Sequence, residues 1–173
     1  RNDIIVRGGC PSENRFFLDG VEIPNINHFS TQGASGGPVG IINPDFIREV
    51  NFYAAAFPAA RGNALSSVLD FKLQDGNQEK SSARAVVGAS EVAFSANGPL
   101  GKKTTYLVSV RRSYLQFLFK AIGLPFLPTY TDAQFKIKHQ IDKQNEISFI
   151  GLGALDDMKL NTGMKDMSDE NKY

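Results

Sequence analysis

Residues 134–141 read QFKIKHQI, and the strict alternation of side chains in this stretch decides the fold. One side of an extended chain carries Phe135, Ile137, His139 and Ile141, and the other carries Gln134, Lys136, Lys138 and Gln140. A period of two predicts a β-strand with one apolar and one polar face. Such strands build either a soluble sandwich, with the apolar faces inside, or an outer-membrane barrel, with the apolar face toward lipid. The periodicity alone leaves both architectures open.

The neighbouring stretches continue the same pattern. Residues 104–112 (TTYLVSVRR) and 146–155 (EISFIGLGAL) alternate in the same way, the latter after a turn at 142–145. Residues 84–97 predict one long strand or two short strands broken at Gly88, and Gly98-Pro99 ends the segment. The chain from about residue 81 is therefore expected to form antiparallel strands, followed from residue 156 by a polar, exposed loop.

An aromatic and leucine-rich connection, SYLQFLFKAIGLPFLPTY, occupies residues 113–130. Its first half has helical spacing, with Leu115, Leu118, Phe119 and Ile122 on one face. The spacing fits either a helix that covers a core or a loop that helps to form a binding mouth.

The first eighty residues are rich in glycine, proline and asparagine. Short apolar runs predict strands at 4–6, 15–18, 50–53 and 66–73, and Asp19-Gly20 is a turn pair. Residues 25–40 form a glycine-rich loop. Asn43-Pro44 begins a short helix that extends to about residue 49, since asparagine caps helices and proline suits their first position.

Composition narrows the functional classes. The 173 residues carry 19 basic and 18 acidic side chains, a net charge of +1 that argues against binding to a nucleic-acid backbone. A single cysteine, Cys10, excludes an internal disulfide and a multi-cysteine metal site. His28 and His139 are too far apart in sequence for an HxxxH-type metal motif, so no metal site is expected.

The sequence also argues against an enzyme. Residues 33–37 (GASGG) match the G-x-S-x-G nucleophile pattern, but no strand precedes the serine and Pro38 follows the motif. We interpret this stretch as a glycine-rich loop, with no catalytic residues and no cofactor. The acidic pairs Asp156-Asp157 and Asp169-Glu170 lack the spacing of a calcium loop and are expected on solvated surfaces.

An ordered set of motifs in the first eighty residues resembles a known family. The set comprises IVRGG (5–9), NRFFLDGV (14–21), INPDFIREV (42–50), ARGNA (60–64) and SVLDF (67–71). In this order the motifs resemble the plug domain of TonB-dependent outer-membrane receptors. The stretch DGVEIPNINHF (19–29) and the glycine-rich loop after it look most like receptors of the Bacteroidetes type.

The resemblance implies a β-rich fold with two parts. Residues 1–78 would be the C-terminal part of a mixed α/β plug domain. Residues 79–173 would form the first four or five antiparallel strands of a large transmembrane β-barrel. A barrel of about 22 strands at about 10 residues each needs more than about 200 residues, so this chain is expected to be a piece whose barrel is not closed.

The resemblance also implies a location, an activity and partners. The chain would lie in the outer membrane of a Gram-negative bacterium, in contact with lipid, and take part in energised uptake of a scarce ligand. A TonB-type complex would act through segments outside the chain, and the ligand would be a siderophore, corrinoid, peptide or glycan. The alternative within this family is a non-transporting relative that serves as a plug or subunit of another outer-membrane assembly. A soluble β-sandwich binding module is the third hypothesis.

Two groups of residues follow from the resemblance as candidates. The candidate ligand contacts are Asn27, His28, Phe29 and Gln32 in the plug loop, with Phe117, Phe119 and Phe126 in the barrel loop. The residues expected to maintain the plug itself are Arg7, Gly8, Asp19, Gly20, Pro44, Glu49 and Gly62. Among these, Arg7 is expected to pair with a carboxylate such as Asp19 or Glu49, because an unpaired charge inside a lumen is costly.

Overall fold

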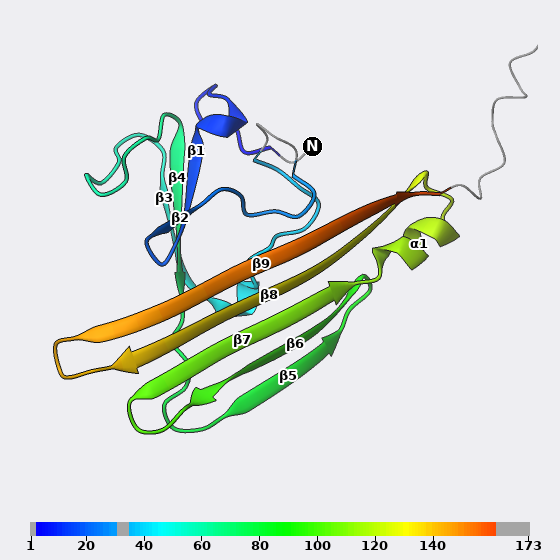
Figure 1. The fold of residues 1–173 in the computed structure, drawn as a ribbon. Helices are drawn as coiled ribbons and strands as arrows, with labels where there is room; N and C mark the ends of the chain where they lie inside the picture. Colours follow the sequence, from blue (N-terminus) through cyan, green and yellow to red (C-terminus); the bar gives the residue numbers. More distant parts are fainter. Residues whose placement is uncertain (1–2, 31–34, 162–173) are drawn as a thin grey trace, which may run out of the picture.

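The computed structural model describes residues 3–30 and 35–161, whose strands form two sheets (Figure 1). The smaller sheet has the order β2-β1-β4-β3. Its strands are β1 (Asn14–Leu18), β2 (Val21–Ile23), β3 (Ile47–Tyr53) and β4 (Ser67–Leu73). The parallel pairing of β1 with β4 is the one parallel pairing among the described strands.

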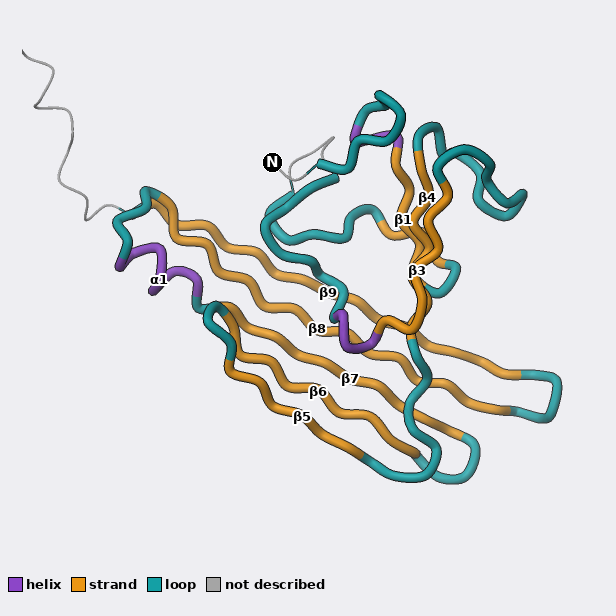
Figure 2. Tube along the Cα trace, turned by 180° about the vertical axis from the view of Figure 1, so that it is seen from behind, coloured by secondary structure: helices purple, strands orange, loops and turns teal. Residues whose placement is uncertain are grey.

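The larger sheet is an antiparallel meander in chain order. Its strands are β5 (Ser82–Val87), β6 (Glu91–Pro99), β7 (Thr104–Ser113), β8 (Phe126–Gln140) and β9 (Glu146–Leu160). The edge strands β5 and β9 are not paired with each other within the described residues, so this sheet is open. The predicted boundary after residue 78 falls in the segment that joins the sheets. Seen from behind, the smaller sheet stands against one face of the larger one (Figure 2).

Short helices and one tight turn complete the fold. The 3₁₀ helices are η1 (Pro11–Glu13) and η2 (Pro44–Phe46), and one α-helix, α1 (Leu115–Ala121), joins β7 to β8. The predicted Asp19-Gly20 turn is confirmed, with φ of +47° and +89°. Asparagine, aspartate and glycine tolerate this left-handed backbone best, so the pair closes the β1–β2 hairpin. No helix in residues 3–30 and 35–161 is long and apolar enough to cross a membrane.

Five of the predicted elements differ from the structure. Residues 4–6 are not a strand, because the Ile4 backbone bonds the Ser35 and Asn14 side chains. The helix at Pro44 ends at Phe46 and the strand begins at Ile47, where pairing with β4 supplies backbone partners. Strand β8 begins at Phe126 and β9 continues to Leu160, because each provides the other's ladder from Phe126↔Leu160 to Gln140↔Glu146.

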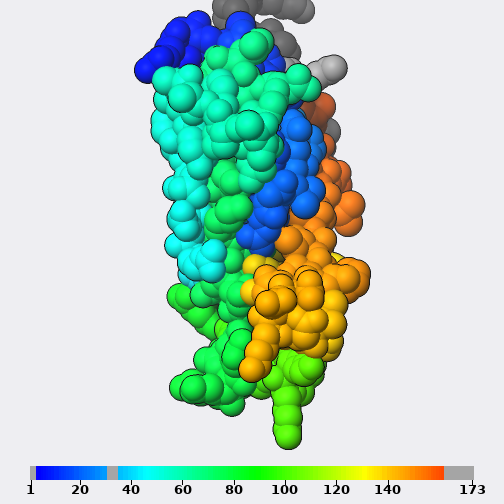
Figure 3. All heavy atoms as spheres, turned by 90° about the vertical axis from the view of Figure 1, so that its left-hand side faces the viewer, coloured from blue at the N-terminus to red at the C-terminus, as the bar shows by residue number. Residues whose placement is uncertain are grey.

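The apolar core lies between the two sheets. It comprises Phe16, Leu18, Ile42, Phe46, Phe71, Leu73 and Leu107, with Ile150 and Leu152 partly buried against it. Most of these residues belong to the smaller sheet and the segment before β3, while Leu107, Ile150 and Leu152 come from the larger sheet. Figure 3 shows the blue and green chain of the smaller sheet beside the orange chain of β9, the strand that contains Ile150 and Leu152.

The face of the larger sheet that meets the smaller sheet is mostly polar. Its buried polar side chains include Ser109, Arg111, Asp132, Gln134 and Lys136. The opposite face carries large apolar side chains that are exposed, among them Phe94 (50%), Val110 (45%), Phe135 (43%) and Phe149 (59%). The predicted alternation is therefore confirmed, with the polar side turned inward and the apolar side turned outward.

Candidate functional site

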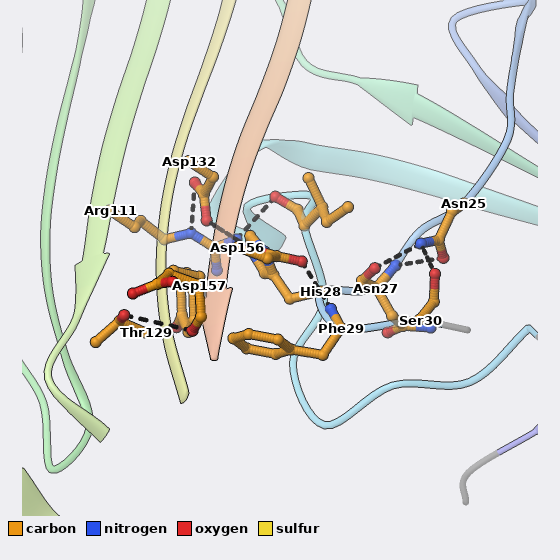
Figure 4. Close-up of polar contacts among 12 residues, drawn as sticks. Asn25, Asn27, His28, Phe29, Ser30, Arg111, Thr129, Asp132, Asp156 and Asp157 are labelled. Carbon is orange, nitrogen blue, oxygen red and sulfur yellow. Dashed lines mark hydrogen bonds and ion pairs between the residues drawn. The ribbon is translucent and has the colours of Figure 1, made fainter. Parts of the chain in front are cut away.

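His28 is the centre of a polar network between the segment of residues 24–43 and the larger sheet (Figure 4). The side chain is 0% exposed. Its Nε2 lies 2.9 Å from Oδ2 of Asp132 on β8, and its Nδ1 lies 2.6 Å from Oδ1 of Asp156 on β9. One imidazole therefore joins the segment to two neighbouring strands.

Arg111 on β7 completes the charged part of this network. Its Nε donates to Asp132 Oδ1 at 3.0 Å, and its Nη2 lies 2.9 Å from Asp132 Oδ2. The same Nη2 donates to the carbonyl oxygens of Gly40 and Ile41 at 2.7 Å each. The guanidinium thus connects the Asp132 carboxylate on β8 to the backbone of the segment.

Aromatic rings and one backbone donor surround the imidazole. The Tyr130 ring stacks on His28 with ring centroids 4.1 Å apart, and the Tyr130 hydroxyl donates to the carboxylate of Glu91 on β6. Phe29, with a φ of +55°, donates its backbone N–H to Asp156 Oδ2 at 2.7 Å. Asp156 accordingly accepts from both His28 and Phe29.

The segment is also tied to itself by backbone bonds. The His28 N–H donates to Val39 O and the Ile41 N–H donates to Ile26 O, each at 2.8 Å. A Cβ at Gly37 would lie 2.4 Å from His28 O, so only glycine fits where the two limbs meet. These contacts hold the described limbs of the predicted loop in one arrangement.

Asn43 fixes the end of the segment by a different set of bonds. Its backbone N–H donates to Gln134 Oε1 at 3.0 Å, and its Nδ2 donates to Ser109 Oγ at 2.8 Å. Its Oδ1 accepts from the Asp45 N–H at 3.0 Å and caps η2, as the sequence predicted for this position. One asparagine thus caps the helix and also contacts the larger sheet.

A second charged cluster lies near the start of the linker between the sheets. Lys136 Nζ is 2.9 Å from Asp19 and 2.8 Å from Asp75. Lys138 Nζ is 2.8 Å from Asp75 and 2.9 Å from Glu146. These residues border a cavity of about 340 Å³ with a charged lining. The cluster joins β8 to the β1–β2 turn through Asp19, to the start of the connection between the sheets through Asp75, and to the start of β9 through Glu146.

The electrostatic environment shifts the pKa of two of these groups. Burial disfavours the charged imidazole of His28, but the hydrogen bonds to Asp132 and Asp156 outweigh it and raise the pKa above 6.5. Burial likewise disfavours the Asp75 carboxylate, but the hydrogen bonds from Lys136 and Lys138 lower its pKa below 3.8. The shifts favour the imidazolium form of His28 and the carboxylate form of Asp75.

The structure separates the predicted ligand contacts into three groups. Asn27, His28 and Phe29 lie together against the larger sheet, with the Asn27 Nδ2 donating to Ser35 O at 2.9 Å. Gln32 lies outside the described residues. Phe117 and Phe119 lie on α1 and Phe126 is the first residue of β8, and these three residues are not among the described contacts of the His28 network.

Those remaining aromatic residues point in different directions. The Phe119 and Phe126 rings meet edge to face, with centroids 5.5 Å apart. Phe117 is 67% exposed and, with Phe94 and Val110, lines a groove of about 570 Å³ on the outward face. Helix α1 has no buried residue, so the prediction that this helix covers a core is wrong for the described chain.

The residues expected to maintain the plug lie mainly in turns. Arg7 and Gly8 form an exposed turn with φ of +53° and +77°. The predicted pairing of Arg7 with Asp19 or Glu49 is wrong, because Asp19 pairs with Lys136 and Glu49 is exposed on β3. An exposed guanidinium in a turn is hydrated and needs no carboxylate.

The other three expected residues are placed as follows. Gly20 closes the β1–β2 turn, Pro44 begins η2, and Gly62 is exposed in the connection between β3 and β4. Beside Gly62, Arg61 forms an ion pair with the smaller sheet: its Nη2 lies 2.7 Å from Asp70 Oδ2, and its guanidinium lies 4.5 Å from the centre of the Phe17 ring.

Sequence reasoning missed the residues of the larger sheet that belong to the network, namely Arg111, Asp132 and Asp156. Arg111 and Asp132 occupy polar positions of alternating strands, and a charge within such a strand is the signal that could have identified them. Asp156 lies at the exposed surface, as the sequence predicted, but its side chain also bonds His28 and Phe29, which the sequence did not indicate. Its position depends on β9 continuing beyond residue 155.

The serine of the G-x-S-x-G pattern has a structural environment. Ser35 is buried, and its Oγ accepts a hydrogen bond from the Ile4 N–H at 2.8 Å. Gly33 and Ala34 of the same pattern lie outside the described residues. Within residues 3–30 and 35–161, no group of three or more histidine, cysteine or acidic side chains is arranged to hold a metal ion.

Comparison with known proteins adds no assignment: no protein-family model matches the chain, and no curated protein matches it.

Proposed function

We propose that this chain is part of a TonB-dependent outer-membrane receptor. The smaller sheet and its loops would be the C-terminal part of the plug, and β5–β9 would be the first strands of the barrel. The function would be energised uptake of a scarce ligand across the outer membrane of a Gram-negative bacterium. The ordered plug-like motifs in residues 5–71 support this reading.

The observation that carries the proposal is the polarity of the larger sheet. A soluble sandwich buries its apolar face, but here the buried face carries Arg111, Asp132 and Lys136, while Phe94 and Phe135 are exposed on the other side. A barrel strand in a membrane has this arrangement, with apolar side chains toward lipid and polar side chains toward the lumen.

The lengths and connections of the strands agree with this proposal. A tilted strand needs about 9–11 residues to cross the hydrocarbon layer. β6 and β7 have 9 and 10 residues, and β8 and β9 have 15 each. The short turns at 100–103 and 141–145 leave the same end of the sheet and would be periplasmic (Figure 1). The longer connection with α1 leaves the opposite end and would be extracellular.

The open edges of the sheet define what else the proposal needs. Unpaired backbone groups are not tolerated in lipid, so β5 and β9 would pair with further strands from outside these 173 residues. A TonB-type complex would likewise act through segments outside the chain. The ligand would be a siderophore, corrinoid, peptide or glycan, approached by the segment around Asn27 and Phe29 and by the aromatic residues near α1.

The membrane assignment is tested by placing a charge on the outward face of the full-length protein. Phe94→Lys should reduce recovery of folded protein in washed outer membranes, because a lysine near the bilayer centre costs about 2–4 kcal/mol. Leu100→Lys is the matched control, since Leu100 is equally exposed but lies in the turn after β6. If the wild type and both variants were instead folded and recovered in the soluble fraction, the assignment as a receptor would be rejected.

Transport is tested separately from location. Cells that express the full-length protein should accumulate the ligand only while the TonB-type complex is present and energised. Membrane location with no dependence of uptake on that complex would favour the non-transporting relative instead.

A further inference from the structure

We propose that His28 is a positioning residue: as a buried imidazolium between Asp132 and Asp156, it fixes the described parts of the segment, residues 24–30 and 35–43, against β8 and β9 and releases them when the proton leaves. We call this arrangement of His28 between two carboxylates the clamp, and we infer it from the contacts on both sides of the ring. Its consequence for ligand uptake rests on the proposed function, which assigns the loop within this segment to ligand contact.

The first argument is the count of donors on the ring. Carboxylate oxygens lie 2.6 Å from His28 Nδ1 and 2.9 Å from Nε2. A neutral imidazole has one N–H and one lone pair, so one nitrogen would face a carboxylate oxygen with no proton between them. Both contacts are satisfied only when both nitrogens carry a proton.

The second argument is charge balance in the buried network. Asp132 and Asp156 bring two negative charges, and Arg111 brings one positive charge. Protonated His28 makes the count among these four groups two against two, so that the buried ring meets each carboxylate as an ion pair. The other titratable groups in the network are Tyr130, stacked on the ring, and Glu91, which accepts from the Tyr130 hydroxyl.

The third argument concerns access. The sequence placed His28 among direct ligand contacts, yet its side chain has no exposed surface and both nitrogens are occupied. Its influence passes through its neighbours: Asp156 also holds the Phe29 N–H, and Arg111 holds the carbonyl groups of Gly40 and Ile41. His28 therefore acts on the position of the segment and not on the ligand.

The direction of the pH dependence follows from the raised pKa of His28. A group whose pKa is higher when bound than when released stabilises the bound form below its ordinary pKa of about 6.5. That stabilisation is lost as the pH rises through the higher value. The segment should therefore be held most firmly in mildly acidic solution and least firmly in alkaline solution.

The protonation state can be measured directly. In full-length protein labelled with ¹⁵N-histidine and purified in detergent, the His28 resonances are identified by their absence from His28→Gln. His139→Gln is the matched control, because among the described residues the His139 ring bonds the Thr104 hydroxyl and its loss should leave the His28 resonances in place. The nitrogen shifts of His28 at pH 7 should be those of a doubly protonated ring. Shifts of a neutral tautomer would overturn the proposal.

The clamp is measured by hydrogen exchange in residues 24–30 and 35–43, expressed as protection factors so that the intrinsic effect of pH is removed. Wild-type protection should fall as the pH is raised from 6 to 9. His28→Gln should lower protection at pH 6 by about tenfold or more and make it independent of pH, since a charged hydrogen bond is lost. Retention of the wild-type pH profile in His28→Gln would overturn the proposal.

Asp156→Asn provides a milder variant if His28→Gln does not fold. Removing one of the two carboxylates lowers the His28 pKa, so the fall in protection should move to lower pH. An unchanged profile would count against the clamp. Neither measurement depends on transport, so the clamp can fail in a working receptor and can hold in a protein that transports nothing.

Discussion

The ammonium group of Lys136 on β8 lies 2.9 Å from the carboxylate of Asp19, in the turn that ends β1. The pair joins the larger sheet to the smaller one across the interface, and both side chains are largely buried. Asp19 also accepts a hydrogen bond from the Leu73 N–H at 2.9 Å, at the end of β4. The turn that closes one hairpin is thus anchored from two directions.

Removing this lysine should destabilise the contact between the sheets. Lys136→Met leaves Asp19 buried without its cation, which costs about 3 kcal/mol. Lys138→Met is the control, because Lys138 is more exposed and its partner Glu146 is half exposed. Urea unfolding of the full-length protein, followed by protease sensitivity of the smaller sheet, measures the difference. Equal midpoints for the two variants would contradict the role of the Lys136–Asp19 pair.

Asp75 should make the same interface sensitive to acid. Its pKa is lowered in the folded protein, so its contribution to stability is complete above about pH 3.8 and is lost as the pH falls through the lower value. Asp75→Asn should be less stable than wild type at pH 7 and should lose less stability between pH 5 and pH 2. An acid-unfolding series on the two proteins compares them, and parallel curves would refute the prediction.

The contact between Phe135 and Gly151 should limit the size of the side chain that is tolerated at position 151 of β9. A Cβ at Gly151 would lie 2.2 Å from the Phe135 ring, whereas a Cβ at Gly153 would meet no atom within 4 Å. Gly151→Leu should displace the ring and cost about 1–3 kcal/mol. Gly153→Leu, two residues along the same face, should be close to neutral. Heat stability of the purified full-length protein measures both, and similar losses would disprove this packing.

Arg61 should stabilise the smaller sheet by charge and by stacking. Arg61→Ala removes the nearer of the two cations beside buried Asp70, leaving Lys72 at 3.4 Å, and uncovers Phe17, with an expected loss of about 1–2 kcal/mol. Arg61→Lys keeps the charge but not the planar stack, so its loss should be smaller. Protection of the β4 amides from hydrogen exchange reports both losses. Wild-type protection in Arg61→Ala would contradict the prediction.

The alternating strands were predicted well because their signal is local. The face assignments around Val110 and Phe135, the turn at Asp19-Gly20 and the cap at Asn43 all follow from residue types at fixed spacing. The extensions of β8 to Phe126 and of β9 to Leu160 were missed. The proline-containing start of β8 pairs with the acidic end of β9, and neither stretch by itself indicates a strand.

The candidate site was predicted on one side only. The motif pattern identified the loop with Asn27, His28 and Phe29, but the partners Arg111, Asp132 and Asp156 are 70 to 128 residues away from their contacts in the segment. The spacing of residues in the sequence contains no information about which residue of the larger sheet faces which residue of the loop. That information arises only when the two sheets are packed.

The sequence by itself determined the strands, their two unlike faces and the tight turns, because these depend on neighbouring residues and on backbone geometry. It left open which face is buried, since alternation is the same in a sandwich and in a barrel. Only the tertiary structure decided that the polar face meets the smaller sheet and that His28 lies between two carboxylates. The reason is physical: burial and charge pairing depend on contacts between distant segments, and those contacts exist only in the folded chain.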